Sequence, residues 1–124
     1  MRLPQFCFLL ASLTALVGMS LGIYMGLAHD HSLTLVHVHL NLIGWVTMFL
    51  MGLYYVTHEH ALGRLAALQV GASVAGYVSM MAGLAILLGT GRESVMPLVI
   101  AGSLLVWLGM LMFIVIIWRT GRRQ

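Results

Sequence analysis

The stretch that decides the fold runs from Leu35 to Tyr55 and reads LVHVHLNLIGWVTMFLMGLYY. It is apolar almost throughout and carries no acidic residue, lysine or arginine, yet it contains His37 and His39. A run of about 20 apolar residues is long enough to cross a bilayer as a helix. The stretch therefore predicts a membrane-spanning helix with two imidazoles inside it, and polar groups at that depth need partners.

The whole chain has the composition of an integral membrane protein. Of its 124 residues, 61% are hydrophobic and 7% are charged, whereas a soluble domain has roughly a quarter charged residues. The length is that of a single domain, residues 1–124. The net charge of +3 comes mostly from the C-terminal tail WRTGRRQ, which favours contact with a lipid bilayer over contact with nucleic acid. The single cysteine, Cys7, excludes an internal disulfide.

Apolar patterning predicts an all-α membrane protein with four transmembrane helices. The expected spans are residues 4–28, 32–57, 62–88 and 95–118, and the breaks between them hold nearly all the charge. With four spans, both termini and the second loop share one side of the membrane. That side carries five of the six arginines, and only Arg92 lies on the other. The positive-inside rule then predicts cytoplasmic termini, in a bacterial-type inner membrane.

Small residues at four-residue spacing predict close helix packing, within a chain or between chains. The two rows are Gly18, Gly22, Gly26 and Ala75, Ser79, Gly83. A polar stripe with the same spacing marks one face of the third span. It predicts hydrogen bonds between helices, with a proton path or a ligand contact as the alternative; its members are Gln69, Ser73 and Tyr77.

The six histidines fall into two classes. His29 and His31 lie at the outer end of the second span and His58 and His60 at its inner end, where solvated loops are favoured over metal sites. The other two histidines lie inside the span, about 8 and 10 Å from its outer end at 1.5 Å per residue.

On a helix, residues two apart point about 200° apart, so His37 and His39 cannot bind one ion from one face. They address two different neighbours. Zinc or copper would need three or four ligands close together. Haem iron, in contrast, takes axial histidines and its macrocycle suits an apolar slot. Spacing alone leaves two interpretations open, namely haem ligands and histidines that hydrogen-bond to carbonyl groups of neighbouring helices.

The segment HVHLNLIGWVTMFLMGLYY resembles the tenth helix of the catalytic subunit of haem–copper oxidases, in particular of the cbb-type oxidases and nitric oxide reductases. The resemblance covers about 20 residues. In that family the first histidine ligates the high-spin haem and the second the low-spin haem, on opposite sides of the helix. The matching residues are His37, Val38, His39, Gly44, Trp45, Gly52, Leu53 and Tyr54, with Ile43 in the usual leucine place.

The resemblance also has clear limits, because the family's copper site uses histidines on other helices and a crosslinked tyrosine. The third and fourth spans here contain no histidine, so the resemblance implies no copper site in one chain and argues against oxygen reduction. The family subunit has twelve helices in three arcs of four, and the motif lies on the second helix of an arc. It is also on the second span here, which implies one arc per chain.

The resemblance therefore implies a homotrimer that holds b-type haem between His37 of one chain and His39 of a neighbour, with bis-histidine ligation. Asn41 and Thr34 are expected to hydrogen-bond a ligand imidazole or a backbone carbonyl. Trp45 and Tyr54 are expected to flank the porphyrin or to serve in packing.

The function expected on this basis is that of an electron-transfer cytochrome. The alternatives are a nitric oxide or oxygen sensor, a minimal reductase or haem-handling protein, and a structural or transport subunit without haem. No C-x-x-C-H motif or donor domain is present, so the sequence does not identify a redox partner.

Overall fold

The computed structural model describes residues 2–122, which are helical apart from short connections. The first span is α1 (Leu3–Ala28), and the third and fourth are α4 (Arg64–Thr90) and α5 (Met96–Gly121). The second span consists of three consecutive segments. These are α2 (Thr34–His39), the π-helix η1 (Leu40–Thr47) and α3 (Met48–Thr57). Two short 3₁₀ turns, η2 (Glu59–Ala61) and η3 (Glu93–Val95), precede α4 and α5 respectively.

The four long helices agree with the four expected spans, and their ends lie within one helical turn of the expected ends. Each is long and apolar enough to cross a membrane, which indicates a membrane protein. Two spans end in the left-handed conformation that commonly closes helices. At the end of α4 this residue is Gly91, with φ 69°, whereas at the end of α1 it is His29, with φ 53°.

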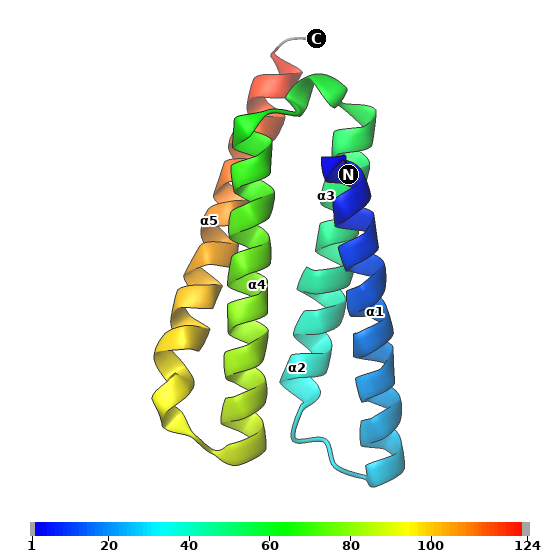
Figure 1. Ribbon diagram of the computed structural model, residues 1–124, viewed down its shortest axis with the longest axis vertical. Helices are drawn as coiled ribbons and strands as arrows, with labels where there is room; N and C mark the ends of the chain where they lie inside the picture. The colour runs from blue at the N-terminus through cyan, green and yellow to red at the C-terminus, as the bar shows by residue number, and fades with distance from the viewer. Residues whose placement is uncertain (1, 123–124) are drawn as a thin grey trace.

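The spans lie side by side in chain order, and each packs mainly on its sequence neighbours (Figure 1). α1 packs along the second span, the second span meets α4 through α2 and η1, and α4 packs along α5. The start of α1 and the end of α5 lie at the end of the molecule that also carries η2, here called the termini end (Figure 1). The arrangement is an open row of helices, with α1 and α5 at its two edges.

Two apolar clusters hold the row together, one toward each end. The cluster near the termini draws buried residues from all four spans: Cys7, Ala11, Met48, Met51, Tyr55, Ala66, Val70 and Ile116. The other cluster joins the second span to α4 through Val36, Leu40, Tyr77, Met80 and Met81. The described part of α5 reaches the second span near the termini, where Phe113 meets Tyr54 edge-on at 5.2 Å between ring centroids.

Glycine permits the closest backbone approach, between α4 and α5. A β-carbon on Gly102 would lie 2.5 Å from the Met80 amide nitrogen, and one on Gly76 would lie 2.7 Å from the Gly102 carbonyl oxygen. The contact therefore does not centre on the expected row of small residues in the third span. From that row Gly83 meets Val99 of α5, but Ala75 is exposed.

The polar stripe of the third span does form hydrogen bonds between helices, through Gln69. This side chain is fully buried, accepts a hydrogen bond from the Tyr55 hydroxyl at 2.8 Å and donates to the Met51 sulfur at 3.2 Å. It also donates to Ser73 in its own helix at 3.1 Å. With every polar atom of the amide engaged, the network joins the second span to α4 and has the character of a structural element.

Large apolar side chains cover the outer surface of the row. Leu27 is 80% exposed, Ile23 65% and Trp107 63%. A soluble monomer rarely exposes continuous apolar surface of this extent. These surfaces are suited to lipid or to other subunits.

Candidate functional site

His37 lies on α2 and faces α1. Its Nδ1 is 2.8 Å from the carbonyl oxygen of Gly18. The ring occupies space that Gly22 leaves open, because a β-carbon there would lie 2.8 Å from the His37 Cε1 atom. Thus two members of the expected glycine row on α1 serve contacts within one chain, and they accommodate side chains of the second span rather than its backbone. A β-carbon on Gly26, the third member, would meet nothing within 4 Å.

The contact with Gly18 determines which nitrogen of His37 carries the proton. A carbonyl oxygen can only accept, so the imidazole must donate from Nδ1. Asn41 also approaches this nitrogen through its amide, but at 3.5 Å this contact is too long to compete. Nε2 is left with its lone pair, the form in which a neutral histidine binds metal.

His39 has the same arrangement with a different partner. Its Nδ1 is 2.7 Å from the carbonyl oxygen of Leu35, one turn earlier in its own helix. Again the carbonyl can only accept, which fixes the proton on Nδ1 and leaves Nε2 as the free nitrogen. Metal-binding histidines commonly hold a backbone carbonyl or carboxylate through the nitrogen that does not face the metal.

The free nitrogens of His37 and His39 both reach the molecular surface. Neither Nε2 has a hydrogen-bond partner among residues 2–122, both residues are half-buried, and no buried side-chain nitrogen or oxygen in this range is unpartnered. Within the described residues no three histidine, cysteine or acidic side chains form a metal cluster. One chain can therefore offer a metal a single imidazole at each of two separate places.

Asn41 belongs to this region, but its strongest bond is to backbone. Its amide donates to the His37 carbonyl oxygen at 2.8 Å, and a β-carbon on Gly18 would come within 2.7 Å of its Nδ2. It therefore packs beside the His37 ring between α1 and the second span. Trp45, 40% exposed, lies on the outer surface, where its ring is available to a neighbouring molecule.

A π-helix begins directly after His39, a feature that the sequence did not predict. Within η1 the Thr47 hydroxyl donates to the Leu42 carbonyl oxygen, five residues earlier, at 2.7 Å. Such segments are rare and often occur at functional sites. Gly44 permits this one to pack closely, since a β-carbon there would lie 2.7 Å from the Tyr77 ring. Because a π-helix has more residues per turn than an α-helix, Asn41 and Trp45 point in other directions relative to the two histidines than they would in a regular α-helix.

Thr34 and Tyr54 make their contacts with other residues, not with His37 and His39. The Thr34 hydroxyl donates to the His31 carbonyl oxygen at 2.7 Å, so of the two expected roles it takes the backbone one. Tyr54 stacks on His58, with ring centroids 4.3 Å apart and 12° between the planes. Thr34 and Tyr54 lie near the two ends of the second span, and neither is hydrogen-bonded to His37 or His39.

The remaining histidines lie in the connections. His29 closes α1, and His31 and His60 are exposed. The His58 ring is hydrogen-bonded through Nδ1, which lies 2.9 Å from the Thr57 hydroxyl. Its ring centroid is 5.9 Å from that of His60. In the connection between α1 and α2, which also contains His31, the backbone N–H of Ser32 donates to Asp30 at 3.0 Å, which lowers the pKa of the Asp30 carboxyl.

Two hollows lie at the termini end of the described structure. One, of about 210 Å³, is lined by residues of η2, α4 and α5, and the other, of about 520 Å³, by residues of α1, α3 and the η2 region. Neither includes His37 or His39. Because the free nitrogens reach the molecular surface, a flat cofactor bound through these imidazoles would lie against the outer surface of the row, where Leu35, Val38 and Leu42 are exposed. A neutral imidazole amid aliphatic side chains is a donor set that suits haem iron.

Comparisons with protein-family models, with curated proteins and with solved structures find no match to this chain.

Proposed function

We propose that the chain is a haem b-binding membrane cytochrome that transfers electrons, with His37 and His39 as axial ligands. One observation carries the proposal. Each imidazole donates from Nδ1 to a backbone carbonyl and leaves Nε2 unpartnered among the described residues. The protein therefore uses only one nitrogen of each ring for its own packing, and the other keeps a lone pair that is accessible to a ligand. The resemblance to the haem–copper oxidase helix adds the choice of cofactor.

The chain's own residues would hold and orient the ligands. The carbonyl groups of Gly18 and Leu35 fix the tautomer of each ring, and such bonds raise the basicity of a ligand imidazole. Gly22 supplies the space that the His37 ring needs. Haem bound at these positions would supply reversible one-electron chemistry.

The same geometry supports assembly with further copies of the chain, and the oligomer that we propose is a homotrimer. The two Nε2 atoms of one chain belong to residues that point about 200° apart, so a haem with two histidines needs a second chain. The open row leaves both edges uncovered and its outer surface apolar, as one arc of a larger helical ring would require. Closed cyclic symmetry is the common solution for such homo-oligomers. Each haem would then lie between His37 of one chain and His39 of the next.

The charge distribution supports a cytoplasmic location for the termini. Arg2 and Arg64 lie where α1 and α4 begin and Arg119 and Arg122 where α5 ends, all at the termini end, whereas Arg92 lies in the connection between α4 and α5. By the positive-inside rule, His37 and His39 then lie in the outer half of a bacterial-type inner membrane. Electron transfer would therefore take place near the outer surface.

The test is an optical spectrum and haem assay of the purified chain in mild detergent. The proposal predicts a Soret band that is lost or strongly reduced in His37→Ala and His39→Ala and is retained in His29→Ala and His58→Ala. Absence of haem in the wild-type chain, or equal haem in all four variants, would contradict it. Absence of haem would favour a structural or transport subunit.

A nitric oxide or oxygen sensor is the second candidate. It is favoured by the separation of the two free nitrogens, because a haem held by one chain alone would keep an open axial position. Carbon monoxide distinguishes the two functions. A spectrum that carbon monoxide leaves unchanged supports the six-coordinate electron carrier, whereas a shifted Soret band supports the sensor.

A further inference from the structure

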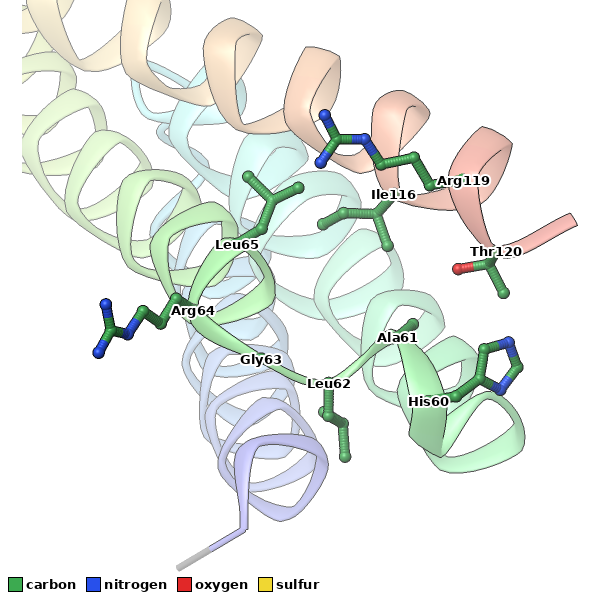
Figure 2. Close-up of a pocket in the computed structure, with 9 residues that line it drawn as sticks. All are labelled: His60, Ala61, Leu62, Gly63, Arg64, Leu65, Ile116, Arg119 and Thr120. Carbon is green, nitrogen blue, oxygen red and sulfur yellow. The ribbon is translucent and has the colours of Figure 1, made fainter. Parts of the chain in front are cut away.

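The smaller hollow at the termini end is built around the start of α4 (Figure 2). Its lining includes backbone and side chains from His60 to Leu65, and from α5 it takes Ile116, Arg119 and Thr120. The volume of about 210 Å³ is large enough for a phosphate group and its nearest substituents. The hollow shares Leu62 and Gly63 with the larger cavity on the other side of the same connection.

The backbone at this helix start has donors without acceptors. Gly63 is the N-cap residue, so no side chain caps the helix, and the first turn contains no acidic residue. The first backbone bond here is from the Ala67 N–H to the Gly63 carbonyl, which leaves the N–H groups of Arg64, Leu65 and Ala66 without helical acceptors. In a helix of 27 residues these groups carry the positive end of the helix dipole, which favours an anion.

Thr120 gives a second, independent indication of a ligand: no buried side-chain oxygen in the described residues is unpartnered, so its unbonded hydroxyl is open to the hollow that it lines. Thr120 is 4% exposed and lines the hollow, and Figure 2 shows its oxygen directed toward the side where Ala61 lies. Threonine in a helix usually bonds to a carbonyl of the preceding turn. Within residues 2–122 the Thr120 hydroxyl has no such bond, whereas those of Thr14, Thr57 and Thr90 do.

Charge completes the site. Arg64 and Arg119 line the hollow on α4 and α5, are exposed, and in Figure 2 extend away from its centre. Their flexible side chains can turn toward a bound anion. The nearby carboxylate of Glu59 lines the other cavity instead. The site lies where α4 begins and α5 ends, beside exposed Trp118, which is the level of lipid headgroups for a span of this length.

We propose that this hollow binds the phosphate of an anionic membrane phospholipid. The N–H groups at the start of α4 and the Thr120 hydroxyl donate to the phosphate oxygens, and Arg64 and Arg119 neutralise the charge. This inference is independent of the haem proposal, because it concerns the opposite end of the second span and other residues.

The test measures the thermal stability of the purified full chain in zwitterionic detergent against three probes: short-chain phosphatidylglycerol, short-chain phosphatidylcholine and inorganic phosphate. Phosphatidylglycerol is expected to raise the unfolding temperature in a saturable manner that weakens with salt. Stabilisation by phosphatidylglycerol with little effect of free phosphate identifies a lipid site. Equal or stronger stabilisation by inorganic phosphate, or none by either anion, overturns the proposal.

Variants locate the site. Thr120→Val is expected to weaken phosphatidylglycerol binding about tenfold, the effect of one hydrogen bond to a charged group. Thr120→Ser, which keeps the hydroxyl, should bind as wild type and controls for folding. The double variant Arg64→Gln/Arg119→Gln should bind more weakly and lose most of the salt dependence, whereas Arg92→Gln at the opposite end should change neither. Unchanged affinity in Thr120→Val and in the double variant would place the lipid elsewhere and contradict the proposal.

Discussion

The two helix pairs of this molecule use glycine in opposite ways. Between α4 and α5, Gly76 and Gly102 bring backbone against backbone. Between α1 and the second span, Gly18 and Gly22 make room for the side chains of Asn41 and His37. The first arrangement gives a tight interface, and the second holds polar groups inside a membrane span. Rows of small residues therefore mark places where two helices pack closely. They do not reveal whether the space beside each small residue is filled by the backbone of the neighbouring helix or by one of its polar side chains.

The largest expected effect comes from Gly102→Ala. The new β-carbon would meet backbone atoms of α4, 2.5 Å from the Met80 nitrogen, and backbone cannot move aside as a side chain can. We expect a loss of about 3 kcal/mol in the free energy of unfolding, at the upper end of ordinary overpacking. Unfolding by denaturant in detergent micelles measures it.

The matched control is Gly71→Ala, also within a long helix, where a β-carbon would meet nothing within 4 Å. Alanine is the better helix former, so this variant should be neutral or more stable by up to about 1 kcal/mol. Equal stability of the two variants would mean that the tight contact between α4 and α5 does not form.

A smaller effect on stability, but a specific one on function, is expected for Gly22→Ala. Its β-carbon would meet the far end of the His37 ring, which can rotate at the loss of its bond to Gly18. That loss, about 1 kcal/mol, is largely offset by the helix propensity of alanine. Haem content, however, should fall several-fold, because the ring no longer presents Nε2 in its original direction.

Gly26→Ala is the control on the same row, since its β-carbon would meet nothing within 4 Å. It should keep full haem content and the wild-type spectrum. If both alanine variants bound haem equally, the position of the His37 ring beside Gly22 would not matter for the cofactor.

The smallest expected effect concerns the connection between α1 and α2, in contrast to the one that follows α4. After α4 the chain turns at Gly91, a residue without a side chain, whereas after α1 the Ser32 N–H bonds to Asp30 and lowers the pKa of that carboxyl below its ordinary value of 3.8. A group with a lowered folded pKa stabilises above its unfolded pKa, and the contribution disappears as the pH falls through the folded pKa. Because Asp30 is exposed, the change is small.

Asp30→Asn keeps an acceptor for the Ser32 N–H but cannot ionise. Its unfolding temperature should therefore change less between mildly acidic and strongly acidic pH than that of the wild type. An identical pH profile for the two proteins would show that this bond does not form in solution.

Hydropathy was sufficient to locate the four spans, because each must be apolar over the thickness of a bilayer. The neighbours of each helix face were harder to infer. Ala75, Ser79 and Gly83 have the same spacing as other small-residue rows, but the α4–α5 contact centres on Gly76 and Gly102. Tertiary packing decides which of these rows forms the contact between two helices, and the sequence alone does not show which row that is.

Helix periodicity assigned His37 and His39 to different faces, and the structure gives each ring its own carbonyl partner. The π-helix from Leu40 to Thr47 has no simple sequence signature, and it lies in a run of apolar residues that suits an ordinary α-helix equally well. The role of Gly18 and Gly22 beside the site also depends on a contact between two spans. These features follow from packing and are not encoded in local propensity.

The central claim is that each haem takes His37 from one chain and His39 from a neighbour. Co-expression of His37→Ala and His39→Ala chains tests it most directly, because each variant retains the histidine that the other lacks. The account predicts that mixed oligomers regain the six-coordinate haem spectrum that neither variant has alone, at a level below wild type. If the mixture binds no more haem than the separate variants, the two histidines do not combine across chains, and the account is contradicted.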